Sequence, residues 1–170
     1  MVATPLTAKD LWSVLQNVTD PEIPVISVVD LGIVRDVRVG PDQRVEVDIT
    51  PTYSGCPAMK EMQDAIVEAL TRAGVRDVSV KQVFSPAWTT DWMSHDARER
   101  LRAYGIAPPM TTRRDRGDDL VQLRRASDAV ACPFCQSDRT EERSHFGSTS
   151  CKALYVCLDC RQPFEHFKAI

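Results

Sequence analysis

Four cysteines near the end of the chain have the spacing of a metal site. Cys132 and Cys135 are separated by two residues, as are Cys157 and Cys160, and 21 residues lie between the two pairs. Two residues between cysteines make a tight turn that directs both thiolates at one ion, and two such turns complete a tetrahedral sulfur site. Zinc is the expected ion, although the same four thiolates also suit iron or an iron–sulfur cluster.

The segment around these cysteines favours a metal over a disulfide framework. From Cys132 onward the chain contains few large apolar side chains. A domain below about 40 residues usually needs a metal or disulfides to fold. We expect a metal, because the chain starts without a secretory signal pattern and because the cysteines are paired. A redox dithiol pair is the alternative. For the fifth cysteine here, Cys151, we expect a buried packing role, with a spare thiol or substitute ligand as the alternative.

A single cysteine, Cys56, lies in the other part of the chain. It follows a loop of hydroxyl-bearing residues from Thr50 to Ser54 and, with Pro57, opens a predicted helix. Backbone N–H groups and the helix dipole at such a position favour the thiolate form. We therefore interpret Cys56 as a candidate ligand for a metal or cluster, or as a nucleophile, with a structural role as the alternative.

Acidic residues near predicted turns are weaker candidates. Asp20, Glu22 and Asp30 lie in one such region, and an aspartate before proline, as Asp20 is, more often forms a turn than takes part in catalysis. The three histidines lack the partners of a helical metal motif. The sequence also lacks a glycine-rich nucleotide motif, a phosphate-binding loop and a nucleophile elbow, so nucleotide-dependent and hydrolase functions have no support.

The elements that would position these residues follow from hydrophobic periodicity. We expect helices from Thr7 to Val18, from Cys56 to a cap at Gly74, and from Thr90 or Ser94 to Tyr104. Segments 33–39 and 44–50 alternate apolar and polar residues and predict an antiparallel hairpin, and 75–83 predicts a third strand. The order helix, hairpin, helix, strand, helix predicts a small α+β domain with helices on one face of a mixed sheet.

Composition divides the chain into two parts. The chain has 170 residues and a net charge of −3, of which residues 1–110 carry −4 and residues 111–170 carry +1. We predict an α+β domain over residues 1–108, an exposed charged linker over 109–129 and a zinc-ribbon-like four-cysteine domain over 130–170. No apolar run is long enough for a membrane helix, so we expect a cytoplasmic protein without membrane contact.

Three motifs, in order, resemble the domain of SufT-type iron–sulfur cluster assembly factors. They are Asp20-Pro21-Glu22-Ile23-Pro24, the segment 28–34, and Thr50-Pro51-Thr52-Tyr53-Ser54-Gly55-Cys56-Pro57. The resemblance covers about residues 7–85 and implies a small α+β domain that assists the maturation of clusters or metal centres. The family's acidic loop and single cysteine match Asp20, Glu22 and Cys56.

Nearly the whole chain is also similar to the family of PaaD-type subunits of phenylacetyl-CoA epoxidase. Segments 84–92, 146–154 and 163–168 and the four-cysteine tail carry this resemblance. It implies a place in aerobic phenylacetate catabolism, where oxygenase subunits hold a di-iron centre and a reductase holds flavin and a [2Fe–2S] cluster. Since this chain has no ligand pattern for those centres, the resemblance implies an accessory subunit.

These observations lead to one hypothesis and two alternatives. The hypothesis is a maturation factor without catalytic activity of its own, in which Cys56, supported by Asp20, Glu22 and Thr50, holds or transfers iron or a cluster, while the zinc-bound tail docks onto oxygenase or reductase subunits. The alternatives are a purely structural subunit and a zinc-ribbon nucleic-acid binder, which the small positive charge of the tail disfavours. The sequence leaves open a homodimer that shares one cluster through Cys56.

Overall fold

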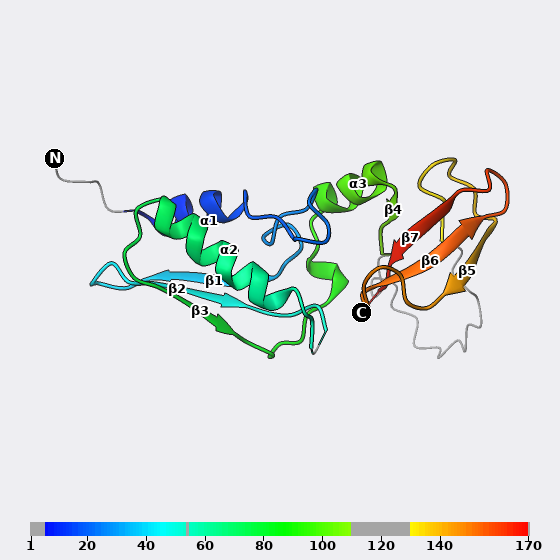
Figure 1. The fold of residues 1–170 in the computed structure, drawn as a ribbon. Helices are drawn as coiled ribbons and strands as arrows, with labels where there is room; N and C mark the ends of the chain where they lie inside the picture. The colour runs from blue at the N-terminus through cyan, green and yellow to red at the C-terminus, as the bar shows by residue number, and fades with distance from the viewer. Residues whose placement is uncertain (1–5, 54, 110–129, 170) are drawn as a thin grey trace, which may run out of the picture. The chain divides into compact units, whose positions relative to one another are not determined.

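The computed structural model describes residues 6–53, 55–109 and 130–169, which divide into two compact units, Met1–Ala97 and Arg98–Ile170. Each unit has its own β-sheet (Figure 1). The boundary between the units falls inside helix α3, His95–Tyr104. Except for Pro109, the predicted linker 109–129 lies outside the described residues.

The first unit packs two helices on one face of a three-stranded sheet. Helix α1 (Ala8–Leu15) precedes strands β1 (Val34–Val39) and β2 (Val45–Ile49), and helix α2 (Met59–Arg72) precedes strand β3 (Val78–Gln82). Strands β1 and β2 are antiparallel, and β3 joins β2 in parallel, so the strand order is β1-β2-β3. Both helices lie over the same face (Figure 1), which confirms the predicted α+β fold with a mixed sheet.

Apolar periodicity explains this packing. The alternating valines and isoleucine of β2 are buried, and so are the apolar positions of both helices, at helical spacing. The N-terminus of α1 has a capping box, because the hydroxyl of Thr7 accepts from the Asp10 N–H at 3.3 Å while the Thr7 N–H donates to the Asp10 carboxylate at 2.9 Å. Gly74, with φ +101°, ends α2 as expected.

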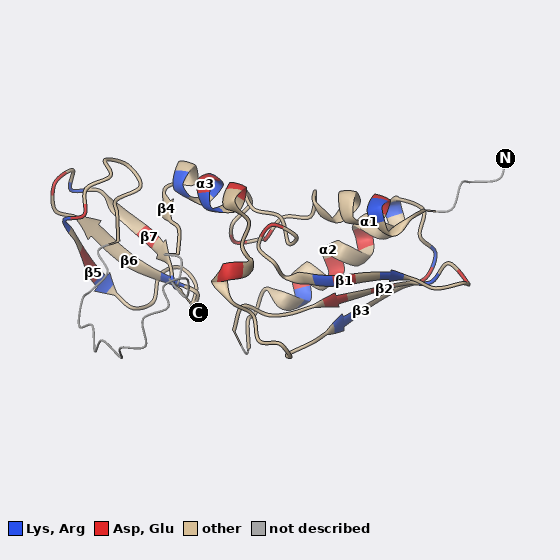
Figure 2. Ribbon diagram, turned by 180° about the vertical axis from the view of Figure 1, so that it is seen from behind, with Lys and Arg blue, Asp and Glu red and all other residues tan. Residues whose placement is uncertain are grey.

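Charged residues lie along all three strands of this sheet (Figure 2), and on β2 they alternate with the buried positions, so they belong to the opposite face. Arg38 on β1 donates to both carboxylate oxygens of Asp48 on β2, at 2.7 and 2.8 Å. Lys81 on β3 pairs with Glu46 on β2 at 3.1 Å. Neighbouring strands therefore balance each other's charges, and the helices cover only the apolar side.

The aromatic connection after β3 packs back onto the first unit. Trp88 is buried, and its Nε1 donates to the Leu31 carbonyl oxygen at 3.0 Å. The Arg35 guanidinium lies 3.4 Å from the ring centroid of Trp92, in the short 3₁₀ helix Thr90–Trp92. Trp88 therefore belongs to the core of the first unit.

Two helix boundaries differ from the expected ones. Helix α2 begins at Met59 and not at Cys56, because Cys56 and Pro57 lie in a preceding turn in which the Cys56 N–H donates to the Tyr53 carbonyl. Helix α1 ends at Leu15 and not at Val18. The last helix has the later of its two expected starts, because Met93 is extended and Ser94 accepts the Ala97 N–H at 3.0 Å as α3 starts.

The second unit is a four-stranded sheet of order β4-β7-β6-β5. Strand β4 is Ile106–Ala107, β5 is Thr140–Ser144, β6 is Lys152–Cys157 and β7 is Pro163–Phe167. Strands β5, β6 and β7 are antiparallel neighbours, whereas β4 joins β7 in parallel. A small core of Ala107, Val130 and Phe164 surrounds the buried Cys132 and Cys157.

The two units divide after Ala97, whereas the sequence predicted that the first domain extends to residue 108. Strand β4 shows why. Ile106 and Ala107 pair with Glu165 and His166 of β7, so they belong to the sheet of the cysteine-rich tail. A strand this short has no periodicity to reveal it in the sequence, and its partner strand lies at the far end of the tail.

Candidate functional site

The four cysteines of the tail converge on one point. Cys132 and Cys135 lie in the turn before β5, Cys157 ends β6, and Cys160 lies in the turn before β7. Their Sγ atoms all lie within 4.8 Å of one another. The Cys132–Cys160 and Cys135–Cys157 sulfur distances are 3.7 and 3.5 Å. The hairpin thus brings together two pairs that are far apart in the sequence.

The two cysteine turns have the same local conformation. Gln136 and Arg161, each following the second cysteine of its pair, both have φ +63°. The Cys132 N–H donates to the Ser137 carbonyl at 2.9 Å, and the Cys157 N–H makes the equivalent bond to the Gln162 carbonyl at 3.0 Å. Backbone N–H groups of Cys160 and Asp159 also donate to the Cys157 sulfur and lower its pKa to about 6.

This donor set fits one tetrahedral ion. Four sulfurs at about 2.3 Å from a zinc ion would be about 3.8 Å apart, close to the sulfur distances of this site. Four thiolates leave no position for water, which is typical of a structural metal site. Since the site is at the centre of the small core of this unit, bound metal would stabilise the unit directly.

Cys151 does not belong to this cluster. It is buried at the start of β6, and its sulfur lies 3.0 Å from the Thr149 hydroxyl oxygen. Among the described residues, one group of three or more His, Cys, Asp or Glu residues has ligand atoms within 4.8 Å of one another, and its members are Cys132, Cys135, Cys157 and Cys160.

Cys56 lies in the first unit, in the turn between β2 and α2. Its sulfur is half-buried and accepts hydrogen bonds from the Ala58 and Met59 N–H groups, as a position before a helix predicts. It lines a hollow of about 380 Å³ with side chains from α2 and from the C-terminal end of β3. The residues that line this hollow are Gly55, Cys56, Pro57, Met59, Lys60, Gln63, Gln82 and Phe84.

The charge around Cys56 differs from the expectation. Burial raises the pKa of its thiol, and the carboxylates of Asp20 and Glu22 raise it further, so these effects outweigh the two N–H groups that favour the thiolate. The N–H groups at the start of the helix favour the thiolate as expected, but burial and the two carboxylates, which local sequence did not reveal, have the larger effect on the pKa. The same observation shows that Asp20 and Glu22, from the loop that precedes β1, act on Cys56 electrostatically.

The remaining candidates have well-defined surroundings. Asp20 is buried and forms a turn, accepting from the Glu22 N–H at 2.8 Å and the Ile23 N–H at 3.1 Å. Thr50 is buried directly after β2, and its hydroxyl has no hydrogen-bond partner in the described part of the chain. Asp30 accepts from the hydroxyls of Ser27 and Ser94, a structural role. Ser54 lies outside the described residues.

Sequence reasoning missed the far wall of the Cys56 hollow. Lys60 and Gln63 belong to α2, Gln82 ends β3, and Phe84 follows it. The available signal was the parallel pairing of β2 and β3, which brings the residues after both strands to the same end of the sheet.

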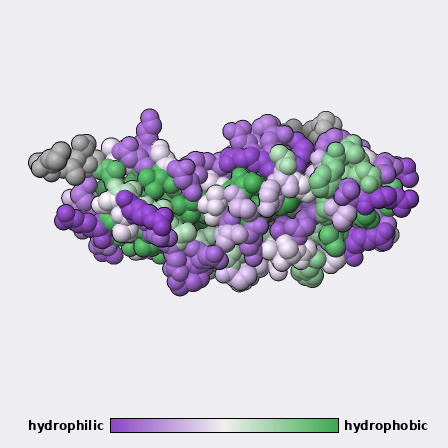
Figure 3. Space-filling model, turned by 45° about the horizontal axis from the view of Figure 1, so that its top comes forward, coloured by the Kyte–Doolittle hydropathy of each residue, from purple (hydrophilic) through white to green (hydrophobic). Residues whose placement is uncertain are grey.

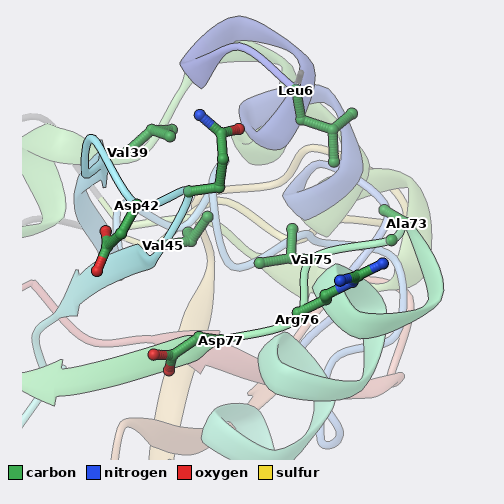
Figure 4. A pocket seen from close by; sticks show the side chains of 10 residues that line it. Leu6, Val39, Asp42, Val45, Ala73, Val75, Arg76 and Asp77 are labelled. Atoms are coloured by element: carbon green, nitrogen blue, oxygen red, sulfur yellow. The ribbon is translucent and has the colours of Figure 1, made fainter. Parts of the chain in front are cut away.

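A second hollow, of about 520 Å³, lies at the other end of these strands (Figure 4). Its lining includes Val39 at the end of β1, Val45 at the start of β2 and Val75 between α2 and β3. None of the candidate residues from the sequence is among those that line it. The Cys56 hollow is therefore the one that the sequence motifs support.

Comparisons with known proteins match both parts of the chain. Residues 8–82 match the family described as "Iron-sulfur cluster assembly protein", and residues 116–168 match the "PaaD zinc beta ribbon domain". The chain is 47% identical to an Escherichia coli (strain K12) protein named as the putative D subunit of 1,2-phenylacetyl-CoA epoxidase, over 98% of this chain and 95% of that protein.

Other relatives match only the first part. A "Fe-S protein maturation auxiliary factor" of Porphyromonas gingivalis is 39% identical over 56% of this chain and 90% of its own length. A conserved hypothetical protein of Thermotoga maritima, of known structure, is 33% identical, with a TM-score of 0.51 over 59% of this chain and 98% of that one. None of the helices in the described residues is both long and apolar enough to cross a membrane.

Proposed function

The chain belongs to the family of PaaD-type subunits of phenylacetyl-CoA epoxidase, and on that premise we propose that it is an accessory subunit that assists the maturation of an iron–sulfur cluster or metal centre of the epoxidase. The first unit matches an iron–sulfur cluster assembly family, and the whole chain matches a named epoxidase subunit. The observation that carries the proposal is the placement of Cys56 in an accessible hollow, under the influence of two carboxylates from a separate loop.

Cys56, Asp20 and Glu22 suit a cation that is held only for a time. Without a cation, burial and the two carboxylates keep the thiol protonated at neutral pH, because its pKa is raised. An iron ion that approaches is attracted by the carboxylates, and its charge favours loss of the thiol proton as the iron–sulfur bond forms. When ligands of a client protein take the iron, a proton returns to Cys56. A raised pKa therefore favours release.

The four-cysteine tail has a separate role in this proposal. Cys132, Cys135, Cys157 and Cys160 would hold one structural zinc ion, which supplies folding energy to a unit with a small core. Iron is the competing ion for the same donor set. The folded tail would then dock onto the oxygenase or reductase subunits that receive the metal or cluster.

The experiment that tests the proposal replaces Cys56 in the presence of its proposed clients. The chain is co-expressed with the oxygenase and reductase subunits as wild type, Cys56→Ala or the control Cys151→Ala. With Cys56→Ala, iron in the oxygenase and the visible absorption of the reductase cluster should fall, while the metal content of the tail stays unchanged. Full cofactor occupancy with Cys56→Ala would contradict the proposal.

A purely structural subunit is the second candidate, favoured by the word "subunit" in the name of the relative that matches nearly the whole chain. It predicts a stable stoichiometric complex with the oxygenase and no dependence of cofactor occupancy on Cys56. A maturation factor should instead associate transiently. Size-exclusion chromatography of the co-expressed proteins distinguishes the two, and the elution volume of the isolated chain also tests the homodimer that the sequence leaves open.

A further inference from the structure

The loop between β5 and β6, residues 145–151, presents an exposed aromatic side chain. Phe146 is 62% exposed, although it lies in a small unit with few large apolar residues. Hydrophobic surface is visible on this unit among hydrophilic side chains (Figure 3). The ring of Phe146 meets the His145 ring edge-on, with 5.2 Å between the centroids. A single exposed aromatic side chain is common on a protein surface, so what distinguishes Phe146 is how its loop and its neighbours hold it.

The backbone of Phe146 is held on both sides. The Ser144 hydroxyl donates to the Phe146 carbonyl oxygen at 2.8 Å and accepts from the Phe146 N–H at 3.2 Å. The next residue, Gly147, donates its N–H to the Lys152 carbonyl at 2.7 Å. The loop therefore presents the ring in a defined position.

The loop is also fixed to strand β7. The Ser148 N–H donates to Glu165 Oε1 at 2.6 Å, and Glu165 Oε2 lies 2.8 Å from the buried Lys152 ammonium. A Cβ at Gly147 would lie 2.7 Å from Glu165 Oε1 and 3.3 Å from the Lys152 Cβ, so the loop passes close to the strand here. Such preorganisation lowers the entropy cost when the ring binds a partner.

Positive charge borders the ring. The Lys168 ammonium lies 4.8 Å from the centroid of Phe146 and donates to the His145 carbonyl oxygen at 3.1 Å. Within the part of the chain that the structure describes, no carboxylate forms an ion pair with Lys168. The charge of Lys168 is thus available to a carboxylate supplied from outside.

We propose that Phe146 and Lys168 form the docking surface for a protein partner, whose complementary site is an apolar pocket with a carboxylate at its rim. Fixed aromatic side chains are typical energetic centres of protein interfaces, and a neighbouring charge pair adds specificity. A polyanion fits this surface less well, because Glu141 and Glu142 lie on the adjoining strand β5. The proposal rests on the proposed function, in which the partner is an oxygenase or reductase subunit.

Binding of the purified full-length, metal-loaded chain to the purified oxygenase and reductase subunits tests this surface. The variants are Phe146→Ala and Lys168→Gln, and the control is Phe134→Ala, which removes another exposed phenylalanine of the same unit. Phe146→Ala should raise Kd by about 30-fold or more, the size of an interface hot spot, whereas Phe134→Ala should change it less than about twofold. Metal content and thermal unfolding verify that each variant is folded.

Lys168→Gln should weaken binding less than Phe146→Ala and should reduce the sensitivity of Kd to salt, because one interfacial charge pair is lost. Equal affinities of wild type and Phe146→Ala would overturn the docking surface and leave the proposed function standing. Absence of binding by the wild type would overturn both proposals. Binding of single-stranded DNA that depends on Phe146 would overturn the assignment to a protein partner.

Discussion

The buried Lys152 and the half-buried Glu165 form an ion pair across strands β6 and β7. The ammonium lies 2.8 Å from the carboxylate, and the Lys152 side chain is only 3% exposed. Burial disfavours the charged form of Glu165, but the Lys152 ammonium and the Ser148 N–H outweigh it, and the pKa of Glu165 is lowered. This pair of charges therefore links β6, β7 and the Phe146 loop.

Removing one partner of this pair should destabilise the second unit strongly. Lys152→Met leaves Glu165 without its counter-ion and should cost about 3–5 kcal/mol, whereas the double variant Lys152→Met/Glu165→Leu should recover part of that loss. The exposed pair Arg143–Glu141 provides the control, since Arg143→Met should cost less than about 1 kcal/mol. Amide hydrogen exchange in β6 and β7 measures all three, and equal costs at the buried and exposed sites would contradict this prediction.

Metal removal should unfold the second unit and leave the first unit folded. All three tryptophans of the chain lie in the first unit, so their fluorescence reports that unit alone. Chelation should abolish exchange protection in β6 and β7 while tryptophan emission stays unchanged. Simultaneous loss of both signals would show that the units do not fold independently.

Metal content, measured by elemental analysis, distinguishes the ligand cysteines of the tail from Cys151. Wild type and Cys151→Ser should each contain about one metal ion per chain, because Cys151 lies outside the four-sulfur cluster, and Cys132→Ser should contain much less. Elemental analysis also identifies the ion, for which we expect zinc. Loss of metal in Cys151→Ser would make Cys151 a ligand.

The features of the fold and of the Cys56 site that could be predicted are those that depend on residues close together in the sequence. The start of a helix at Thr7, the cap at Gly74 and the strand with alternating Val45, Val47 and Ile49 were all predicted correctly from neighbours in the sequence. The pKa of Cys56 could not be predicted in this way. A local argument included the helix terminus but neither the burial nor the carboxylate charges of Asp20 and Glu22, which belong to a distant loop.

Those carboxylates should make the Cys56 thiol slow to react. Because its pKa is raised, little thiolate is present at neutral pH, and alkylation by iodoacetamide should accelerate as the pH rises toward and above 9. Glu22→Gln and Asp20→Asn each remove a negative charge and should increase the rate at pH 7.5, by up to about tenfold for one pKa unit. Asp42→Asn, at the opposite end of the sheet, is the control.

Peptide mass spectrometry follows Cys56 separately from the tail cysteines. A rate unchanged by both Glu22→Gln and Asp20→Asn would contradict the electrostatic link between the acidic loop and the thiol, and with it the mechanism of cation attraction.

His166 should make the second unit less stable in mild acid. Its Nδ1 lies 3.2 Å from the Ala107 carbonyl oxygen, which requires a donating N–H, and burial lowers its pKa below the ordinary 6.5. As the pH falls below 6.5, His166 binds a proton in the unfolded state while it is still neutral in the folded state. The free energy of unfolding therefore decreases. Above 6.5, both states are neutral at this residue and its contribution is constant.

Replacing His166 tests this pH dependence. His166→Gln keeps an N–H donor without titrating and should flatten the loss of β7 exchange protection between pH 7.5 and 5.5. His145→Gln, which removes an exposed histidine, should leave it unchanged. A pH dependence that is identical in wild type and His166→Gln would assign the effect to another group, such as a cysteine of the metal site.

Gly32 allows the aromatic connection to pack closely on the first unit. A Cβ at this position would lie 2.8 Å from the Trp92 Cβ, and Gly32 has φ +75°, where other residues are strained. Gly32→Ala therefore combines backbone strain with a steric clash. Gly74→Ala is the matched control, because Gly74 has φ +101° but no neighbouring atom within 4 Å of the place that a Cβ would take, so only strain applies.

The difference between these two glycine variants isolates the contact with Trp92. We expect Gly74→Ala to cost about 1 kcal/mol, and Gly32→Ala to cost at least about 1–3 kcal/mol more, as overpacking does in a core. Chemical denaturation followed by tryptophan fluorescence measures both, since Trp88 and Trp92 report the packing of this segment. If the two variants were equally destabilised, the segment after β3 would move aside freely, and the packing of Trp92 against Gly32 would not contribute to the stability of the first unit.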